Sequence, residues 1–151
     1  SHKNKTVDEV LTYHNKECGL LGVSGVSSDH RETSKEAENG NKRAKLALDL
    51  LAYSVKKYIG AYMAVLNGAE AIVFTGGIGE NSFEAREQIL EDMEALGIVI
   101  DKDKNKNFKR GQIELISAEN SKVKVYVIPT DEELMMARDT KEIVKNLKKS
   151  K

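Results

Sequence analysis

The sequence has one cysteine, no excess of either charge and no long apolar run. With Cys18 alone, neither a disulfide framework nor a cluster of thiolate metal ligands is available, which fits a reducing compartment. The 24 basic and 24 acidic residues cancel and are mixed along the chain, so no basic face for nucleic acid is expected. No stretch is long enough to cross a membrane and no signal peptide opens the chain. We therefore expect a cytoplasmic protein with no nucleic-acid or membrane partner.

The 151 residues match the usual size of one domain with a real core. No Met opens the chain and its first residues resemble the middle of a protein, so we expect a fragment of a longer protein. The lysines near the other end are expected to form a solvated helix terminus: Lys145, Lys148, Lys149 and Lys151.

The segment from Ala71 to Ser82 is the most informative stretch. An apolar run that favours a strand is followed by Gly76, Gly77 and Gly79, and then by a helix start. Glycines let a backbone adopt positive φ and approach a ligand closely, and the start of a helix offers unpaired N–H groups. The order strand, tight turn and helix therefore suits a phosphate or a ribose.

The two familiar phosphate motifs do not fit this turn. A P-loop needs a lysine and a hydroxyl residue after its last glycine, whereas Gly79 is followed by Glu80. A dinucleotide fingerprint needs a further glycine at the position of Ser82. A plain tight connection and a ligand cradle remain equally open from geometry alone.

The helix after the turn is predicted to start at Asn81, which forms a capping-box pattern with Glu84. Apolar residues then recur at helical spacing until Gly97 ends the helix.

A second unusual stretch ends in a dense polar cluster, Ser27 to Arg31. Ser28 or Asp29 could cap a short helix, which is a purely structural role. The same cluster offers hydroxyl, carboxylate, imidazole and guanidinium groups that suit a ribose, an adenine and phosphates. The residues leave both interpretations open.

The remaining pattern predicts alternating helices and strands. We expect further helices over Thr6–Lys16, with a Thr6 and Glu9 capping box, and over Asn41–Asn67. The long second helix should belong to the core, with a subunit interface as a further possibility. Strands are expected over four segments: Glu70–Phe74, Ile98–Ile100, Ile113–Ile116 and Val123–Ile128. The last two should be neighbours in one sheet, and the segment between Asp101 and Gly111 should be a solvated connection.

A last helix is predicted after Pro129. Thr130 and Glu133 form another capping-box pattern, and the helix dipole favours Asp131 and Glu132 in the first turn. A carboxylate at the carboxyl end of a strand could also serve a magnesium ion, although spacing alone favours the structural role.

Three stretches together resemble the acetate kinase family: Gly22–Arg31, Phe74–Ser82 and Val127–Leu134. Their order and separation also match, and the similarity covers nearly the whole chain. The resemblance implies an α/β, ribonuclease-H-like (actin-like ATPase) domain with a mixed sheet flanked by helices. It also implies that residues 1–151 form the C-terminal nucleotide-binding domain of a two-domain kinase, in which helix 131–151 packs on the N-terminal domain.

The family transfers a phosphoryl group between ATP and acetate, giving acetyl phosphate and ADP, and its C-terminal domains form homodimers. By resemblance, Asp29, His30 and Arg31 would lie at the adenosine end of the nucleotide. The residues wrapping the nucleotide would be Gly77, Ile78, Gly79, Glu80 and Asn81. Glu132 would be the carboxylate linked to Mg²⁺. The family often has a bulkier apolar residue at position 30 and an aspartate at position 32.

The family's acetate pocket and its phosphoryl-stabilising arginines, histidine and aspartate lie upstream of the region seen here. We therefore expect no catalytic residue in this chain and no turnover by it alone. Without the N-terminal domain, three outcomes are open for the last helix: partial exposure of its apolar residues, repacking of the helix, or its exchange between chains. The residues concerned are Met135, Met136, Ile143, Val144 and Leu147. The alternatives are a butyrate or propionate kinase, or a non-catalytic actin-like nucleotide-binding module.

Overall fold

A computed structural model of the chain describes residues 5–149, except for the side chains of Glu132, Lys148 and Lys149. Its elements in chain order are α1 (Val7–Lys16), α2 (Gly19–Ser24), α3 (His30–Glu38), α4 (Lys42–Val65), β1 (Ala71–Phe74), α5 (Gly76–Asn81), α6 (Phe83–Leu90), the 3-10 turn η1 (Glu94–Leu96), α7 (Lys102–Asn107), β2 (Glu114–Leu115), β3 (Lys124–Val127) and α8 (Glu132–Lys149). Within the described residues no helix has the length and apolar character needed to cross a membrane.

The described sheet is mixed and has the strand order β1-β3-β2. β1 pairs with β3 in parallel, Phe74 opposite Val127, and β2 pairs with β3 in antiparallel register. The strand predicted over Val123–Ile128 is confirmed as β3, whose residues alternate: Val125 and Val127 are fully buried whereas Lys124 is exposed. Parallel pairing places the carboxyl ends of β1 and β3 at the same edge of the sheet.

The core lies between this sheet and the helices α4 and α6. It joins Ala52 of α4, Ile89 and Leu90 of α6, Phe74 of β1 and the valines of β3. Met93 and Ile98 complete it from the segment after α6. Burial of these apolar side chains is the main stabilising contribution to this part of the fold.

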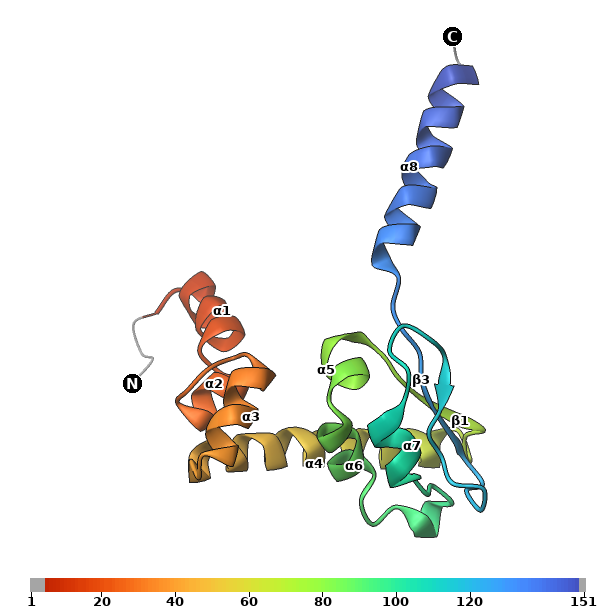
Figure 1. The fold of residues 1–151 in the computed structure, drawn as a ribbon. Helices are drawn as coiled ribbons and strands as arrows, with labels where there is room; N and C mark the ends of the chain where they lie inside the picture. The colour runs from red at the N-terminus through yellow and green to blue at the C-terminus, as the bar shows by residue number, and fades with distance from the viewer. Residues whose placement is uncertain (1–4, 150–151) are drawn as a thin grey trace.

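α4 spans the whole body of the molecule (Figure 1). α2 and α3 pack on it, and so does α6. Arg43, in its first turn, donates from Nε to the carbonyl oxygen of Val23 at 3.0 Å, which fixes α2 near the start of α4. Asn41 caps the helix by accepting from the backbone N–H groups of Arg43 and Ala44. The predicted helix is confirmed, and it supports both the N-terminal helices and the core.

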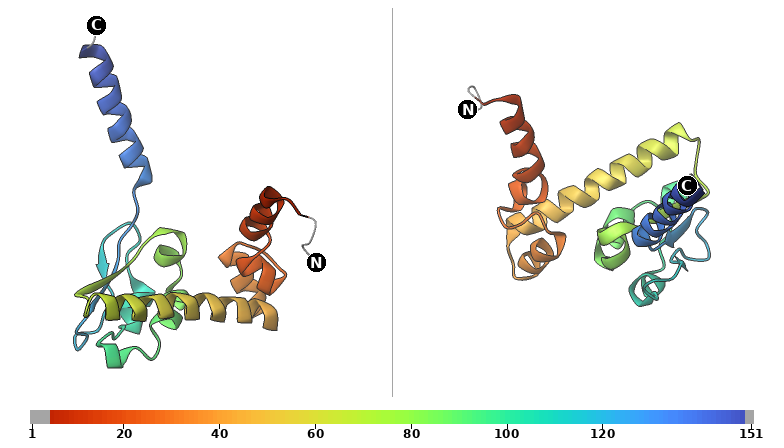
Figure 2. Two further views of the ribbon diagram at one scale, coloured as in Figure 1. Left: turned by 180° about the vertical axis from the view of Figure 1, so that it is seen from behind. Right: turned by 90° about the horizontal axis from the view of Figure 1, so that it is seen from above.

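α8 projects away from the sheet (Figure 1 and the left view of Figure 2). Its apolar side chains are exposed, with Met136 at 61% and Leu147 at 64%. Of the three outcomes open for this helix, the structure therefore shows exposure of its apolar residues. The predicted Thr130 and Glu133 capping box is wrong, because Asp131 accepts from the backbone N–H of Leu134 at 2.8 Å and takes the cap position. Thr130 is bonded to Glu80 instead.

Other predictions need correction around α6. The helix starts after Ser82, whose Oγ accepts from the N–H of Ala85 at 3.1 Å, and not at Asn81. It ends at Leu90, because the chain breaks its helical course at Asp92, where φ is 56°. Gly97 does end the segment, in the left-handed conformation.

The segment after Gly97 differs from the prediction in two ways. The strand expected over Ile98–Ile100 is reduced to an isolated bridge between Ile100 and Ser117. The segment expected to be a solvated loop contains α7, capped by Asp101, and Asn105 of α7 is fully buried. At the opposite end of the chain, the predicted Thr6 and Glu9 capping box is confirmed, although α1 buries no residue. β1 is only half buried, since Val73 is 50% exposed.

Candidate functional site

Gly76, Gly77 and Gly79, here called the glycine segment, lie in the first turns of α5 and not in a turn before it. Thr75 precedes the helix at the carboxyl end of β1, and Gly76 starts it with φ of +71°. A Cβ at Gly79 would lie 3.3 Å from the carbonyl carbon of Phe74, so α5 packs closely on β1 and a side chain there would press on the strand backbone. A Cβ at Gly77 would meet nothing within 4 Å. Gly79 therefore serves packing, whereas Gly77 leaves bare backbone toward open space.

A cavity of ≈ 690 Å³ lies between the start of α3 and α5. Its lining residues are Asp29, His30, Arg31, Gly77, Ile78, Asn81, Ser82 and Arg110. This volume is typical of small-molecule and cofactor sites. The two segments singled out in the sequence thus face one space, and the glycine segment is open toward the polar cluster.

Asp29 takes the capping role that the sequence left open for Ser28 or Asp29. It caps α3 by accepting from the backbone N–H of Arg31 at 2.8 Å, and it also binds the Arg31 guanidinium through Nε and Nη2, at 3.1 and 2.6 Å. The side-chain and backbone hydrogen bonds from Arg31 lower the pKa of Asp29 to about 2. The cavity therefore presents an ionised carboxylate that is already paired with a guanidinium.

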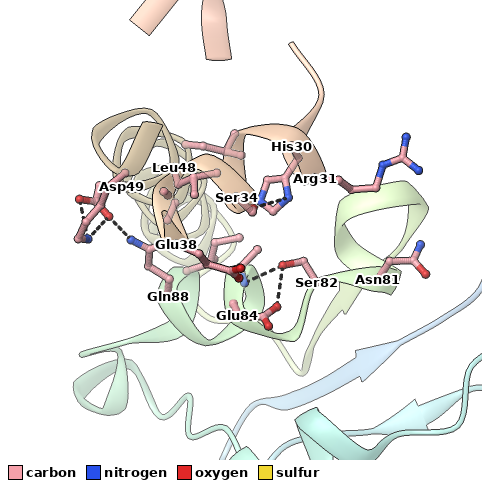
Figure 3. Close-up of a pocket in the computed structure, with 16 residues that line it drawn as sticks. His30, Arg31, Ser34, Glu38, Leu48, Asp49, Asn81, Ser82, Glu84 and Gln88 are labelled. Carbon is pink, nitrogen blue, oxygen red and sulfur yellow. Dashed lines mark hydrogen bonds and ion pairs between the residues drawn. The ribbon is translucent and has the colours of Figure 1, made fainter. Parts of the chain in front are cut away.

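His30 also lines a second cavity, of ≈ 500 Å³, between α3, α4 and α6 (Figure 3), and Arg31, Asn81 and Ser82 line both cavities as well. The Nδ1 of His30 lies 3.4 Å from the Ser34 hydroxyl oxygen. Burial lowers the pKa of His30, and Glu84 and Asp29 oppose that shift. Burial therefore favours the neutral form of the ring.

Asn81 is fixed at the cavity wall, because its Nδ2 donates to the carbonyl oxygen of Gly77 at 2.8 Å. Gly79 and Glu80 do not line this cavity. Glu80 instead connects the two strand ends: its Oε1 accepts from the N–H of Gly76 at 2.8 Å and from the N–H and hydroxyl of Thr130, both at 2.9 Å. These bonds, led by the Thr130 N–H, lower the pKa of Glu80. Its carboxylate holds the site together and does not face the cavity.

The proposed magnesium ligand Glu132 begins α8, but its side chain lies outside the part of the chain that the structure describes. Among the described residues no group of three or more His, Cys, Asp or Glu side chains could hold a metal. Magnesium in phosphoryl-transfer sites usually takes one or two protein carboxylates together with substrate phosphates and water. A single carboxylate at this position is compatible with that chemistry.

Sequence reasoning missed Arg110 and Arg86. Arg110 lies in the segment interpreted as solvated, where nothing in the local pattern separates it from the neighbouring lysines. Arg86 is fully buried, and its Nη1 donates to the carbonyl oxygen of Gly79 at 2.7 Å. The only available signal was a charged residue on an apolar helix face.

A model of the acetokinase family matches residues 1–138. The chain belongs to that family. It is 65% identical over 136 residues to the acetate kinase of Clostridium botulinum, covering 90% of this chain and 34% of that protein. The chain thus spans about a third of the length of the curated relatives it matches.

Two solved structures show the same fold. The crystal structure of Porphyromonas gingivalis acetate kinase matches with a TM-score of 0.84 and 47% identity, over 94% of this chain and 35% of that chain. A propionate kinase from Francisella tularensis matches with a TM-score of 0.79 and 40% identity, over 90% of this chain and 34% of that chain. The α/β, actin-like domain with a small mixed sheet flanked by helices is therefore confirmed.

Proposed function

We propose that this member of the acetokinase family is the nucleotide-binding part of a cytoplasmic acetate kinase, which transfers a phosphoryl group reversibly between ATP and acetate. The main support is one observation. Asp29, His30 and Arg31 line the same cavity as Gly77, Ile78 and Asn81, although the two segments are far apart in the sequence. In a kinase family, a polar cluster that faces bare helix backbone across a cavity of this size favours a nucleotide as the ligand.

Each lining residue is suited to a different part of the nucleotide. The Asp29 carboxylate can accept hydrogen bonds from the ribose or the adenine amino group. The exposed Arg31 guanidinium can donate hydrogen bonds to oxygens of the nucleotide. Gly77 lets the ligand approach the α5 backbone, because no side chain intervenes. Gly79 and Glu80 do not line the cavity and support it indirectly, because they hold α5 against β1 and the end of β3.

We propose Glu132 as the carboxylate that supports Mg²⁺, because it follows the carboxyl end of β3 at the edge that the glycine segment shares. A bound magnesium ion would neutralise charge on the phosphates. Phosphoryl transfer also requires cations around the transferring group and an acceptor pocket. The chain spans only about a third of the length of its curated relatives, and we place the acceptor pocket and the groups that stabilise the transferring phosphoryl group in the remainder, so this chain alone should not form acetyl phosphate.

The assembly is also a proposal. The exposed aromatic and aliphatic side chains of α4, with Tyr58 and Tyr62 at 60 and 62% exposure, fit an interface between two C-terminal domains. The exposed apolar side chains of α8 fit packing on an N-terminal domain, which would make this chain the C-terminal part of a two-domain kinase.

A propionate kinase is the second candidate, favoured by the similarity to the Francisella tularensis structure. The choice of carboxylate depends on residues outside the nucleotide cavity. Comparison of kcat/KM for acetate, propionate and butyrate in the full-length protein would decide between these acceptors.

Calorimetric titration with ADP and Mg²⁺ tests nucleotide binding. Gly77→Val places its side chain in the cavity and not against the protein, so it should abolish binding without unfolding the chain. Gly60→Val is the matched control, because a Cβ at Gly60 of α4 also meets nothing within 4 Å and lies outside the cavity. Binding by wild type and Gly60→Val but not by Gly77→Val is expected. Equal binding by all three proteins, or by none, would overturn the proposed site.

An acetyl phosphate assay tests the predicted inactivity of the chain alone. We expect no product above the background. Turnover that scales with protein concentration and survives further purification would contradict the assignment of the catalytic groups to another part of the enzyme.

A further inference from the structure

The loop after α7, residues 108–112, contributes one lining residue to the proposed nucleotide cavity that the sequence did not indicate. Its base is fixed: Phe108 packs against the hydrophobic core, and the Arg86 guanidinium lies 4.6 Å from the centre of the Phe108 ring. Arg86 is in turn held by the side chain and backbone of Asn105 in α7. The core therefore determines where this loop passes.

Arg110 is the residue that this loop brings to the cavity. It lines the ≈ 690 Å³ cavity together with Gly77, Ile78 and Asn81. It also lines a small adjoining space of ≈ 20 Å³ with Glu80, Val127 and Pro129, at the carboxyl edge of the sheet. In open α/β sheets this edge is where ligands bind. Arg110 thus lies beside both the bare backbone of α5 and the strand ends.

The charged side chains that line the cavity indicate which kind of ligand Arg110 can bind. Two arginines and one aspartate are found among the described residues that line it. Arg31 forms an ion pair with Asp29 at 2.6 Å, whereas the described side chains offer Arg110 no ion pair. Glu80 is nearby, but its Oε1 already accepts from Gly76 and Thr130. The Arg110 guanidinium therefore lines the cavity without an ion-pair partner among the described side chains, and such a group favours an anionic ligand.

We propose that Arg110 is a binding residue for the phosphate groups of the nucleotide. The inference rests on the proposed function, since it assigns one more contact to the same ligand. A guanidinium is always ionised near neutral pH and matches phosphate oxygens with two parallel hydrogen bonds, which a lysine ammonium cannot reproduce. Phosphate contact also follows from position, because Arg110 lies at the strand edge and the polar cluster of α3 supplies the groups suited to adenosine.

The test compares the affinities of ADP and adenosine for wild type, Arg110→Ala, Arg110→Lys and Lys109→Ala. Lys109→Ala removes the same charge one residue away, from an exposed position that does not line the cavity. Arg110→Ala should weaken ADP binding roughly 10- to 100-fold, as expected for a lost charged hydrogen bond, with less than about a twofold change for adenosine. Arg110→Lys should fall between, and Lys109→Ala should stay within about twofold of wild type for both ligands.

Three results would overturn the inference. Wild-type ADP affinity in Arg110→Ala, equal losses for ADP and adenosine, or an equal ADP loss in Lys109→Ala would each exclude a phosphate contact by Arg110. If the wild-type chain binds neither ligand, the proposed function itself fails and the inference fails with it. Unchanged thermal midpoints of the variants, expected for exposed side chains without hydrogen-bond partners among the described residues, exclude unfolding as the cause.

Discussion

Arg86 donates from Nη1 to the carbonyl oxygen of Gly79 at 2.7 Å, which joins the buried start of α6 to the glycine segment of α5. The same guanidinium donates from Nε to the Asn105 side chain at 2.6 Å and from Nη2 to the Asn105 carbonyl at 3.1 Å. Burial lowers the pKa of Arg86 to about 10, so the group remains charged at neutral pH. One side chain thus holds α5, α6 and α7 together behind the cavity.

Arg86→Met should destabilise the chain by about 3 kcal/mol or more, because it leaves buried acceptors on Gly79 and Asn105 without donors. Urea unfolding at neutral pH measures the free energy of unfolding. Arg138→Met on the exposed face of α8 is the control, and it should change that free energy by less than about 0.5 kcal/mol. Equal effects of the two substitutions would show that the buried hydrogen bonds contribute little.

Gly77→Ala and Gly79→Ala should change stability in opposite directions. An alanine at Gly77 meets open space and should stabilise α5 by up to about 1 kcal/mol through helix propensity. An alanine at Gly79 would press on the backbone of Phe74 at 3.3 Å and should cost about 1–3 kcal/mol. Thermal unfolding without nucleotide compares them, and a Gly79→Ala variant as stable as Gly77→Ala would contradict the close packing.

Glu80→Gln should reduce stability at neutral pH and flatten its decline in acid. The hydrogen bonds from Thr130 and Gly76 hold the pKa of Glu80 below its ordinary value of 4.5 in the folded chain. The Glu80 carboxyl therefore binds a proton more readily in the unfolded chain than in the folded chain. The stabilisation from the ionised Glu80 is fully present above about pH 4.5 and is lost as the pH falls through the pKa of the folded chain. Free energies of unfolding across this range measure the effect.

The matched control for that experiment is Glu142→Gln, in an exposed part of α8. It should leave the free energy of unfolding at neutral pH within about 0.5 kcal/mol of wild type. The interpretation of Glu80 fails if Glu80→Gln retains both the neutral stability and the acid slope of wild type.

Removal of the His30 imidazole should flatten the pH dependence of stability below neutrality. Burial is the main cause that lowers the pKa of His30 below 6.5, so protonation is harder in the folded chain than in the unfolded one. Stability should therefore fall as the pH drops from 6.5 toward the folded pKa. His30→Phe and His30→Gln should both reduce this loss between about pH 7.5 and pH 5, despite their different packing. If neither does, His30 does not control this slope.

The sequence was most informative where local chemistry decides the structure. The Thr6 and Glu9 capping box, the long helix capped by Asn41 and the alternation of β3 depend on near neighbours, and all three are observed. The corrections lie where distant parts of the chain compete. Thr130 carries a capping pattern, yet it pairs with Glu80, which is fifty residues away.

Long-range geometry also explains what was missed at the candidate site. The resemblance to the acetate kinase family predicted that Asp29 and Gly77 share a ligand, and both line one cavity. No local pattern placed Arg110 there, because its position depends on Phe108 packing in the core and on the buried Asn105 that anchors α7. A Lys- and Asn-rich segment looks solvated until its few buried members are known. The roles of these residues in nucleotide binding stay predictions.

The two walls of the cavity are supported by the same helix, α4. α3 packs on α4, and so does α6, which directly follows α5. We therefore expect a ligand that draws the walls together to strain α4 between these packing sites. Closure would then be recorded in slower or faster amide hydrogen exchange along the middle turns of that helix, at a distance from any atom that touches the ligand.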